Sequence, residues 1–166
     1  MKIRKLVIVE GFQDSGKTSL LKDFVSAVLT KRNATPYLKN GTPCIYKGAA
    51  FNKRCDLTTL KCPDGDITIV INDNGRIIVV VTIGDDDDVA RRVKKILENI
   101  GVDVDVLIVA VRCTIKTLRK RYERIFKVKA EIIFKPGFKH WKEFEKKEQN
   151  KWNAYFMTEL LTMVQR

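Results

Sequence analysis

The chain has 166 residues, of which 45% are hydrophobic and 31% charged, and its 32 basic and 20 acidic residues give a formal net charge of +12. This length and composition predict a single domain over residues 1–166 with a substantial core, and they exclude a disordered or low-complexity chain. No apolar run is long enough to span a membrane, and Met1–Lys5 leads directly into a strand, so we expect a cytoplasmic protein without a signal peptide.

The first predicted element is a buried strand, Ile3–Glu10, whose apolar run Leu6–Val9 continues up to a glycine. The next eight residues, Gly11-Phe12-Gln13-Asp14-Ser15-Gly16-Lys17-Thr18, match the pattern G-x-x-x-x-G-K-[ST] at every fixed position. After them, apolar residues recur on one helical face, namely Leu20, Leu21, Phe24, Val25, Val28 and Leu29. A strand, a glycine-rich turn and a helix form the context in which this pattern binds phosphate.

The residue types in this turn suit the phosphate chain of a nucleotide. Glycines allow successive backbone N–H groups to point at phosphate oxygens, and the helix N-terminus adds a partial positive charge. We expect Lys17 to reach the outer phosphates and the Thr18 hydroxyl to hold Mg²⁺. The residues expected to bind the nucleotide are Gly11, Phe12, Gln13, Asp14, Ser15, Gly16, Lys17, Thr18 and Ser19.

The segment Ala34–Gly65 shows no sustained periodicity and contains three of the four prolines, so we interpret it as a loop region that faces the substrate. After it, two β-rich runs, Ile67–Asn72 and Arg76–Ile83, are joined by Asp73-Asn74-Gly75, which predicts a β-hairpin. The second run is apolar at nearly every position. It is therefore expected to lie inside the sheet with both faces covered.

Helices and strands alternate through the rest of the chain. The patterns predict a helix over 87–99 that stops at Gly101, a strand over 104–111, a short helix over 116–126, a strand over 129–134 and a helix from about residue 139 onward. We interpret the aromatic residues of the last helix as core, and not as a base-stacking surface; they are Trp141, Phe144, Trp152, Tyr155 and Phe156. The element order predicts an α/β layered fold with a mostly parallel sheet, into which the hairpin brings one antiparallel strand.

Two charged residues directly after predicted strands are expected to complete the site. Asp85 begins the block Asp85–Asp88, and we expect it to hold Mg²⁺ together with Thr18, with Asp86 as the second choice. Alternatively, the four carboxylates only stabilise the positive end of the helix that they precede. Arg112 follows the strand over 104–111, at the edge where ligands bind in such sheets, so we expect it to act in catalysis with Lys17 and Asp85.

These motifs resemble those of several known families. The complete phosphate pattern resembles the Walker A motif of the P-loop NTPase superfamily, which implies a three-layer α/β fold with a mostly parallel central sheet and one antiparallel hairpin strand. The stretch from Glu10-Gly11 to Gly16-Lys17-Thr18-Ser19 is similar to thymidylate and deoxynucleoside kinases. The turns Thr82-Ile83-Gly84-Asp85 and Ala110-Val111-Arg112 resemble those of small bacterial and phage-type ATP-binding proteins of unassigned function.

The hairpin is also similar in layout to small GTPases, although the aspartate of their D-x-x-G motif is Val81 here. The guanine-reading N-K-x-D motif is absent, because the corresponding strand ends in Val111-Arg112-Cys113-Thr114. The resemblances therefore imply ATP and Mg²⁺ as cofactors.

The sequence thus predicts a Mg²⁺-dependent ATP-binding protein, either an ATPase or a small kinase for a nucleoside or nucleotide. The nucleophile is either water or a substrate hydroxyl, and the candidate bases are Glu10, Asp14 and Asp85. The alternative is a nucleic-acid-associated or regulatory ATP-binding module with little turnover. It rests on the segment 116–151, which contains 13 basic and 5 acidic residues and so has a net charge of +8. A solvated basic surface is the simpler interpretation of that segment.

Overall fold

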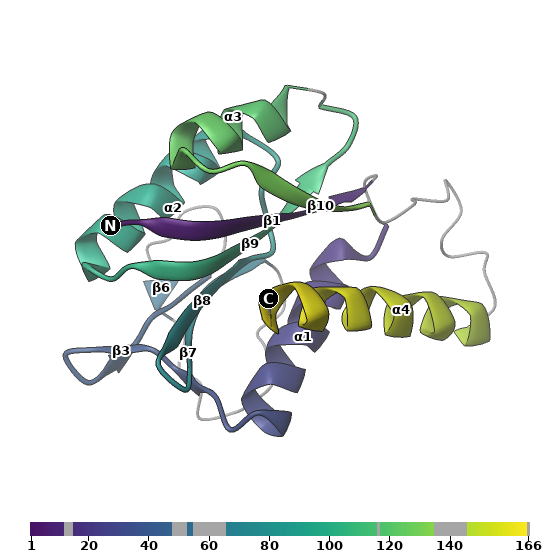
Figure 1. Ribbon diagram of the computed structural model, residues 1–166, viewed down its shortest axis with the longest axis horizontal. Coiled ribbons are helices and arrows are strands. Elements are labelled where there is room, and N and C mark those ends of the chain that lie inside the picture. Colours follow the sequence, from purple (N-terminus) through teal and green to yellow (C-terminus); the bar gives the residue numbers. More distant parts are fainter. Residues whose placement is uncertain (12–14, 48–52, 55–65, 116, 135–145, 166) are drawn as a thin grey trace.

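The computed structural model describes residues 1–11, 15–47, 53–54, 66–115, 117–134 and 146–165. In chain order, the helices and strands are β1 (Ile3–Gly11), α1 (Lys17–Lys31), β2 (Thr35–Pro36), β3 (Leu38–Lys39), β4 (Thr42–Pro43), β5 (Ile45–Lys47), β6 (Lys53–Arg54), β7 (Ile67–Asp73), β8 (Arg76–Val81), α2 (Asp87–Ile100), β9 (Val104–Arg112), α3 (Leu118–Phe126), β10 (Ala130–Phe134) and α4 (Lys146–Gln165). They form a layered α/β structure, with α1 and α4 on one face of a mixed sheet and α2 and α3 on the other (Figure 1). The predicted fold class is therefore confirmed as α/β with a mostly parallel mixed sheet.

The main sheet has the strand order β10-β1-β9-β8-β7-β5-β6, and β2 pairs with β7 off this path. Its four strands from β10 to β8 are parallel to their neighbours. From β7 onward the pairing is antiparallel, and it includes β5, β6 and β2. The sequence predicted only one antiparallel strand, so it underestimated the antiparallel part of the sheet. The short strands β2 to β6 come from the segment that had been interpreted as a loop, because two- and three-residue strands leave no periodic signal.

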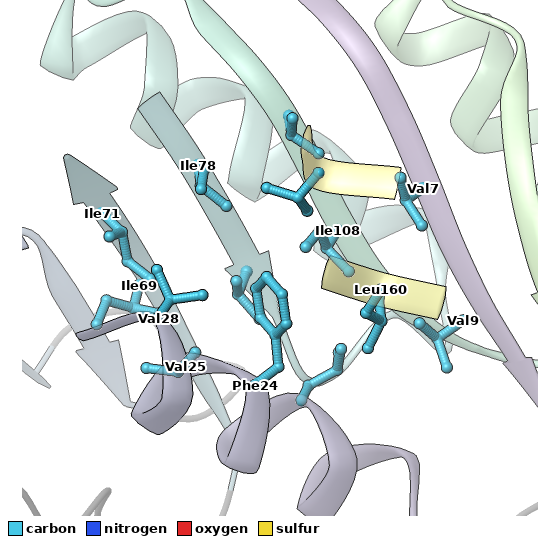
Figure 2. Packing of buried hydrophobic residues seen from close by; sticks show 14 of the residues in the cluster. Val7, Val9, Phe24, Val25, Val28, Ile69, Ile71, Ile78, Ile108 and Leu160 are labelled. Carbon is cyan, nitrogen blue, oxygen red and sulfur yellow. The ribbon is translucent and has the colours of Figure 1, made fainter. Parts of the chain in front are cut away.

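Each central strand is buried on both faces, as the unbroken apolar runs predicted. In β1, Val7 and Val9 face the side covered by α1 and α4, whereas Leu6 and Ile8 face α2 and α3, and all four are fully buried. Figure 2 shows the first of these cores, where Phe24 of α1 and Leu160 of α4 contact the sheet. Burial of both faces fixes the strands in position, so the residues at their ends are held by a rigid support.

The turns around the second half of the chain also follow the sequence. Asn74 and Gly75 have positive φ angles of 52° and 88°, as a two-residue hairpin turn requires. Asp86 is the N-cap residue of the helix α2, and its Oδ1 accepts a hydrogen bond of 2.7 Å from the backbone N of Val89. It ends at Gly101, which adopts the left-handed conformation (φ 77°). The helix and hairpin predictions for residues 67–101 are thus confirmed.

The interpretation of the C-terminal aromatics as core is wrong for two of them. Phe156 is buried, but Trp152 and Tyr155 are 39% and 56% exposed. Only one stripe of α4, containing Phe156, Leu160 and Val164, packs against α1 and the sheet. The N-terminal turns of α4 extend beyond the sheet, so helical spacing alone does not bury their aromatics (Figure 1). Trp141 and Phe144 lie outside the described residues. No helix in the described part of the chain is long and apolar enough to cross a membrane.

The strands β1 and β9 are neighbours in the sheet, but the helices that follow them pack on opposite faces: α1 after β1 on one face, and α3 after β9 on the other. Such a pair is a topological switch point, and open α/β sheets bind ligands in the crevice beyond the carboxyl ends of its strands. Gly11 and Arg112, the last residues of the two strands, are register partners. The N–H of Cys113 also donates a hydrogen bond of 3.0 Å to the carbonyl of Gly11.

Candidate functional site

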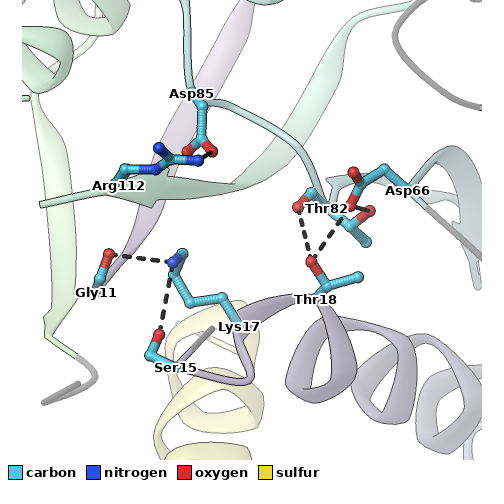
Figure 3. Close-up of polar contacts among 8 residues, drawn as sticks. All are labelled: Gly11, Ser15, Lys17, Thr18, Asp66, Thr82, Asp85 and Arg112. Carbon is cyan, nitrogen blue, oxygen red and sulfur yellow. Dashed lines mark hydrogen bonds and ion pairs between the residues drawn. The ribbon is translucent and has the colours of Figure 1, made fainter. Parts of the chain in front are cut away.

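The start of α1 lies at this switch point and carries the lysine of the phosphate pattern. Gly16 precedes the helix in the left-handed conformation (φ 75°, ψ 20°) and, as a glycine, has no side chain that could cap the first turn. The Nζ of Lys17 lies 3.1 Å from the carbonyl oxygen of Gly11 and 3.5 Å from the Oγ of Ser15 (Figure 3). Lys17 thus folds back over the end of β1. Together, the N-terminus of α1 and this ammonium group form a positively charged corner suited to an anion.

A cluster of hydroxyl and carboxylate oxygens surrounds Thr18, one residue further along α1. The Thr18 hydroxyl lies 3.3 Å from Oδ1 of Asp66 and 3.3 Å from the carbonyl oxygen of Thr82. The Thr82 hydroxyl is 3.2 Å from the same Asp66 oxygen and accepts a hydrogen bond of 2.8 Å from the N–H of Ile67. Each threonine hydroxyl has a single proton, which it can donate either to Asp66 or to a nearby backbone carbonyl. Asp66 is thereby oriented toward Thr18 (Figure 3).

Asp85 forms an ion pair with Arg112. Its Oδ2 lies 2.8 Å from Nη2 of Arg112, and both side chains are about one third exposed (Figure 3). The Nε of Arg112 is buried without a hydrogen-bond partner among the described residues, so this guanidinium keeps an unused donor beside the phosphate pattern. Asp86, the second choice for a metal ligand, is the N-cap of α2. For Asp86 the helix-stabilising role is thus observed.

The structure brings several of the predicted residues together and leaves others elsewhere. Gly11, Ser15, Gly16, Lys17 and Thr18 surround the end of β1, and Arg112 with Asp85 lies beside them. Ser19 points to solvent on α1. The remaining residues of the pattern, Phe12, Gln13 and Asp14, lie outside the described residues.

The sequence analysis did not identify Asp66 and Thr82. A signal for both was present in the predicted hairpin, because a two-residue turn at Asn74-Gly75 pairs Asp73 with Arg76 and fixes every later pair. Continuing this register past the last pair, Thr68 with Val81, puts Ile67 opposite Thr82 and Asp66 next to it. Asp85 was predicted as the metal ligand because it follows a buried strand. An antiparallel strand, however, carries the residue before it to the same edge of the sheet.

The oxygen atoms near Thr18 suit Mg²⁺, which takes part of its ligands from water and phosphate. They do not form a complete set of protein ligands for a metal. No three His, Cys, Asp or Glu side chains gather into a metal-binding group within the part of the chain that the structure describes. Mg²⁺ is usually bound by one or two carboxylates together with waters and substrate phosphates, and the hydroxyl of Thr18 and the carboxylate of Asp66 match that ligand type. The residues present therefore fit a magnesium–nucleotide complex.

Comparisons with known proteins do not add a relative to this picture. The chain matches no family model, no curated protein and no solved structure. The chemistry of the site is therefore argued from its own residues: a cationic corner for phosphate, a hydroxyl with an adjacent carboxylate, and an arginine held by a second carboxylate.

Proposed function

We propose that this protein binds ATP with Mg²⁺ at the end of β1 and transfers its terminal phosphoryl group, either to water or to a small substrate such as a nucleoside or nucleotide. One observation carries the proposal: Lys17 and Thr18 begin a helix at the β1–β9 switch point, and the Thr18 hydroxyl lies 3.3 Å from the carboxylate of Asp66. A tight turn without a ligand does not need a carboxylate at that position. The three-layer P-loop NTPase fold belongs to the same proposal.

Each group has a role in this function. The backbone N–H groups at the start of α1 and the Lys17 ammonium hold the phosphate oxygens. Thr18 and Asp66 hold Mg²⁺, which neutralises charge on the phosphates when it is bound. Arg112 supplies a second cation at the neighbouring strand end, and Asp85 positions its guanidinium through the 2.8 Å ion pair. Holding the phosphates in place accounts for most of the catalysis in this reaction class.

The proposal is tested by measuring ATP binding and ATP hydrolysis with the intact chain, with and without Mg²⁺. We expect Mg²⁺-dependent binding, and turnover that is either direct or stimulated by a nucleoside or nucleotide. Binding without turnover under all conditions would favour the regulatory alternative. Absence of ATP binding in the folded protein would contradict both.

We expect Asp66→Asn to reduce Mg²⁺-dependent ATP binding by about 10- to 100-fold, because it removes the charge next to Thr18 while keeping an oxygen acceptor for the two threonines. ATP binding measured in EDTA should change little. The matched variant is Asp85→Asn, which should lower turnover and leave the Mg²⁺ dependence of binding unchanged. A third variant, Asp88→Asn, controls for the acidic block, since Asp88 is exposed on α2. If Asp85→Asn abolishes the Mg²⁺ dependence and Asp66→Asn does not, Asp85 is the metal ligand, as the sequence first indicated.

We also expect ATP to bind at least about tenfold more tightly than GTP, which corresponds to one unmatched set of base hydrogen bonds. The reason is the absence of N-K-x-D after β9, where the chain reads Arg112-Cys113-Thr114. Competition of the two nucleotides against a fluorescent ATP analogue measures the ratio. A preference for GTP would show that guanine is bound by other residues.

A further inference from the structure

The outer surface of the α2–α3 layer carries a concentration of basic side chains. The two helices lie on the same face of the sheet and contact each other (Figure 1). Their apolar residues are buried against the sheet. Their outer side chains, and those of the turn that follows α3, include seven exposed cations, which we call the α2–α3 basic face: Arg91, Arg92, Lys95, Lys120, Arg124, Lys127 and Lys129. Positions 91 and 95, and positions 120 and 124, lie one helical turn apart, so each helix presents a row of cations.

Two of the carboxylates near these cations are engaged with other groups. Glu98 is paired with Lys94 at 3.9 Å, and Glu123 lies 3.5 Å from Arg119 and accepts a hydrogen bond from the N–H of Ala130. The other carboxylates of the layer, Asp85 to Asp88, stand at the N-terminal end of α2. Asp87 and Asp88 stand one helical turn before Arg91 and Arg92, so the positive charge of the face is concentrated toward Lys95 and α3.

The strongest concentration of positive charge lies on α3 and the turn after it. Between Thr117 and Ala130 the chain has six basic side chains and one carboxylate, Glu123, which is already engaged with Arg119 and the N–H of Ala130. The opposite face of the sheet carries the exposed aromatics Trp152 and Tyr155. A local excess of cations of this size indicates an anionic partner for the α2–α3 basic face.

The chemistry of the basic face also selects among polyanions. Proteins that bind single strands stack bases on exposed aromatic side chains. The aromatic residues of α3, Tyr122 and Phe126, are buried, and no exposed aromatic lies on α2 or α3. Cations without stacking groups match the phosphates of a duplex, whose bases are already stacked on one another. The helix α2 has 14 residues and a length of about 21 Å, which is shorter than one duplex turn of about 34 Å.

We propose that the α2–α3 basic face binds the phosphate backbone of a nucleic-acid duplex, without sequence specificity. This surface lies on the α2–α3 face of the sheet and goes beyond the nucleotide site, because its binding does not require ATP. If four or five of the cations contact phosphates, the logarithm of the binding constant falls with the logarithm of salt concentration with a slope of about −4.

The test measures binding of the intact protein to a random duplex of about 20 base pairs, roughly two turns, across a salt series. Duplex DNA and duplex RNA form two arms, and a single strand of the same length and anionic lipid vesicles form two more. The double variant Lys95→Ala/Lys120→Ala removes one cation from each helix. The matched control is Lys151→Glu on α4, which changes the net charge by the same amount on the opposite face.

We expect the double variant to reduce the magnitude of the salt slope by about 2 and to weaken duplex binding up to about 60-fold at 0.1 M salt. Lys151→Glu should leave both quantities near their wild-type values. Equal losses in the two variants would mean that only net charge matters and would overturn the proposal. The same holds if the duplex does not bind at low salt, if the single strand binds more tightly, or if only the vesicles bind.

Discussion

Replacement of Lys17 by alanine is expected to weaken ATP binding by about 100-fold or more and to leave the fold intact. A hydrogen bond from a charged donor to phosphate contributes about 2–3 kcal/mol, which corresponds to that factor. In the structure the Lys17 ammonium contacts the carbonyl of Gly11 at 3.1 Å, a contact that stabilises the fold by only about 1 kcal/mol. Titration with a fluorescent ATP analogue gives the affinity, and thermal unfolding gives the stability.

The melting temperature of Lys17→Ala should therefore fall by no more than about 2–4 °C. A suitable control is Lys151→Ala, which removes an exposed lysine from α4 and should change neither quantity. If Lys17→Ala is folded and binds ATP as tightly as the wild type does, the nucleotide site is not at the end of β1.

The second large effect is expected at Gly84, between β8 and α2. A Cβ atom there would lie 2.3 Å from the carbonyl oxygen of Ala110, 2.5 Å from Cγ1 of Val109 and 3.0 Å from the hydroxyl of Tyr122. The nearest atom belongs to the backbone of β9, which is fixed in the middle of the sheet. Gly84→Ala is therefore expected to lower the free energy of unfolding by about 3 kcal/mol or more, and the melting temperature by about 6–12 °C.

The control for this variant is Gly101→Ala. A Cβ at Gly101 meets no atom within 4 Å, so its cost of about 1 kcal/mol comes only from the positive φ angle of 77°. Equal destabilisation by the two substitutions, measured by chemical denaturation, would show that β8 and α2 move apart freely at Gly84. Since Asp85 follows directly, Gly84→Ala should also disturb the ion pair with Arg112 and reduce turnover in the protein that remains folded.

The sequence was most informative where local chemistry determines the backbone. The pair Asn74-Gly75 specified the hairpin turn, and Gly101 marked the end of α2. Unbroken apolar runs identified the central strands, because both of their faces are covered by helices. Each of these features depends on neighbouring residues, which is why one sequence was sufficient to predict them.

Features that depend on pairing between distant segments were harder to predict. The partner of Thr18 is Asp66, which is 48 residues away and precedes its strand, so no local pattern marks it. The pair Asp85–Arg112 joins the segment after β8 to the last residue of β9, 27 residues away. To predict it requires the strand order, which the sequence did not provide. The burial of Phe156 and the exposure of Trp152 depend on where α4 leaves the sheet, and helical periodicity does not contain that information.

The position of β1 in the sheet has a consequence for the order in which the protein is synthesised and folds. The pairing partners of β1 are β9 and β10, which begin only at Val104 and Ala130. A nascent chain that ends before residue 104 therefore has a hydrophobic first strand without a sheet to join. Contacts across more than 100 residues slow folding, because the intervening chain must be ordered first. The nucleotide site proposed at the end of β1 can accordingly form only after β9 has been synthesised.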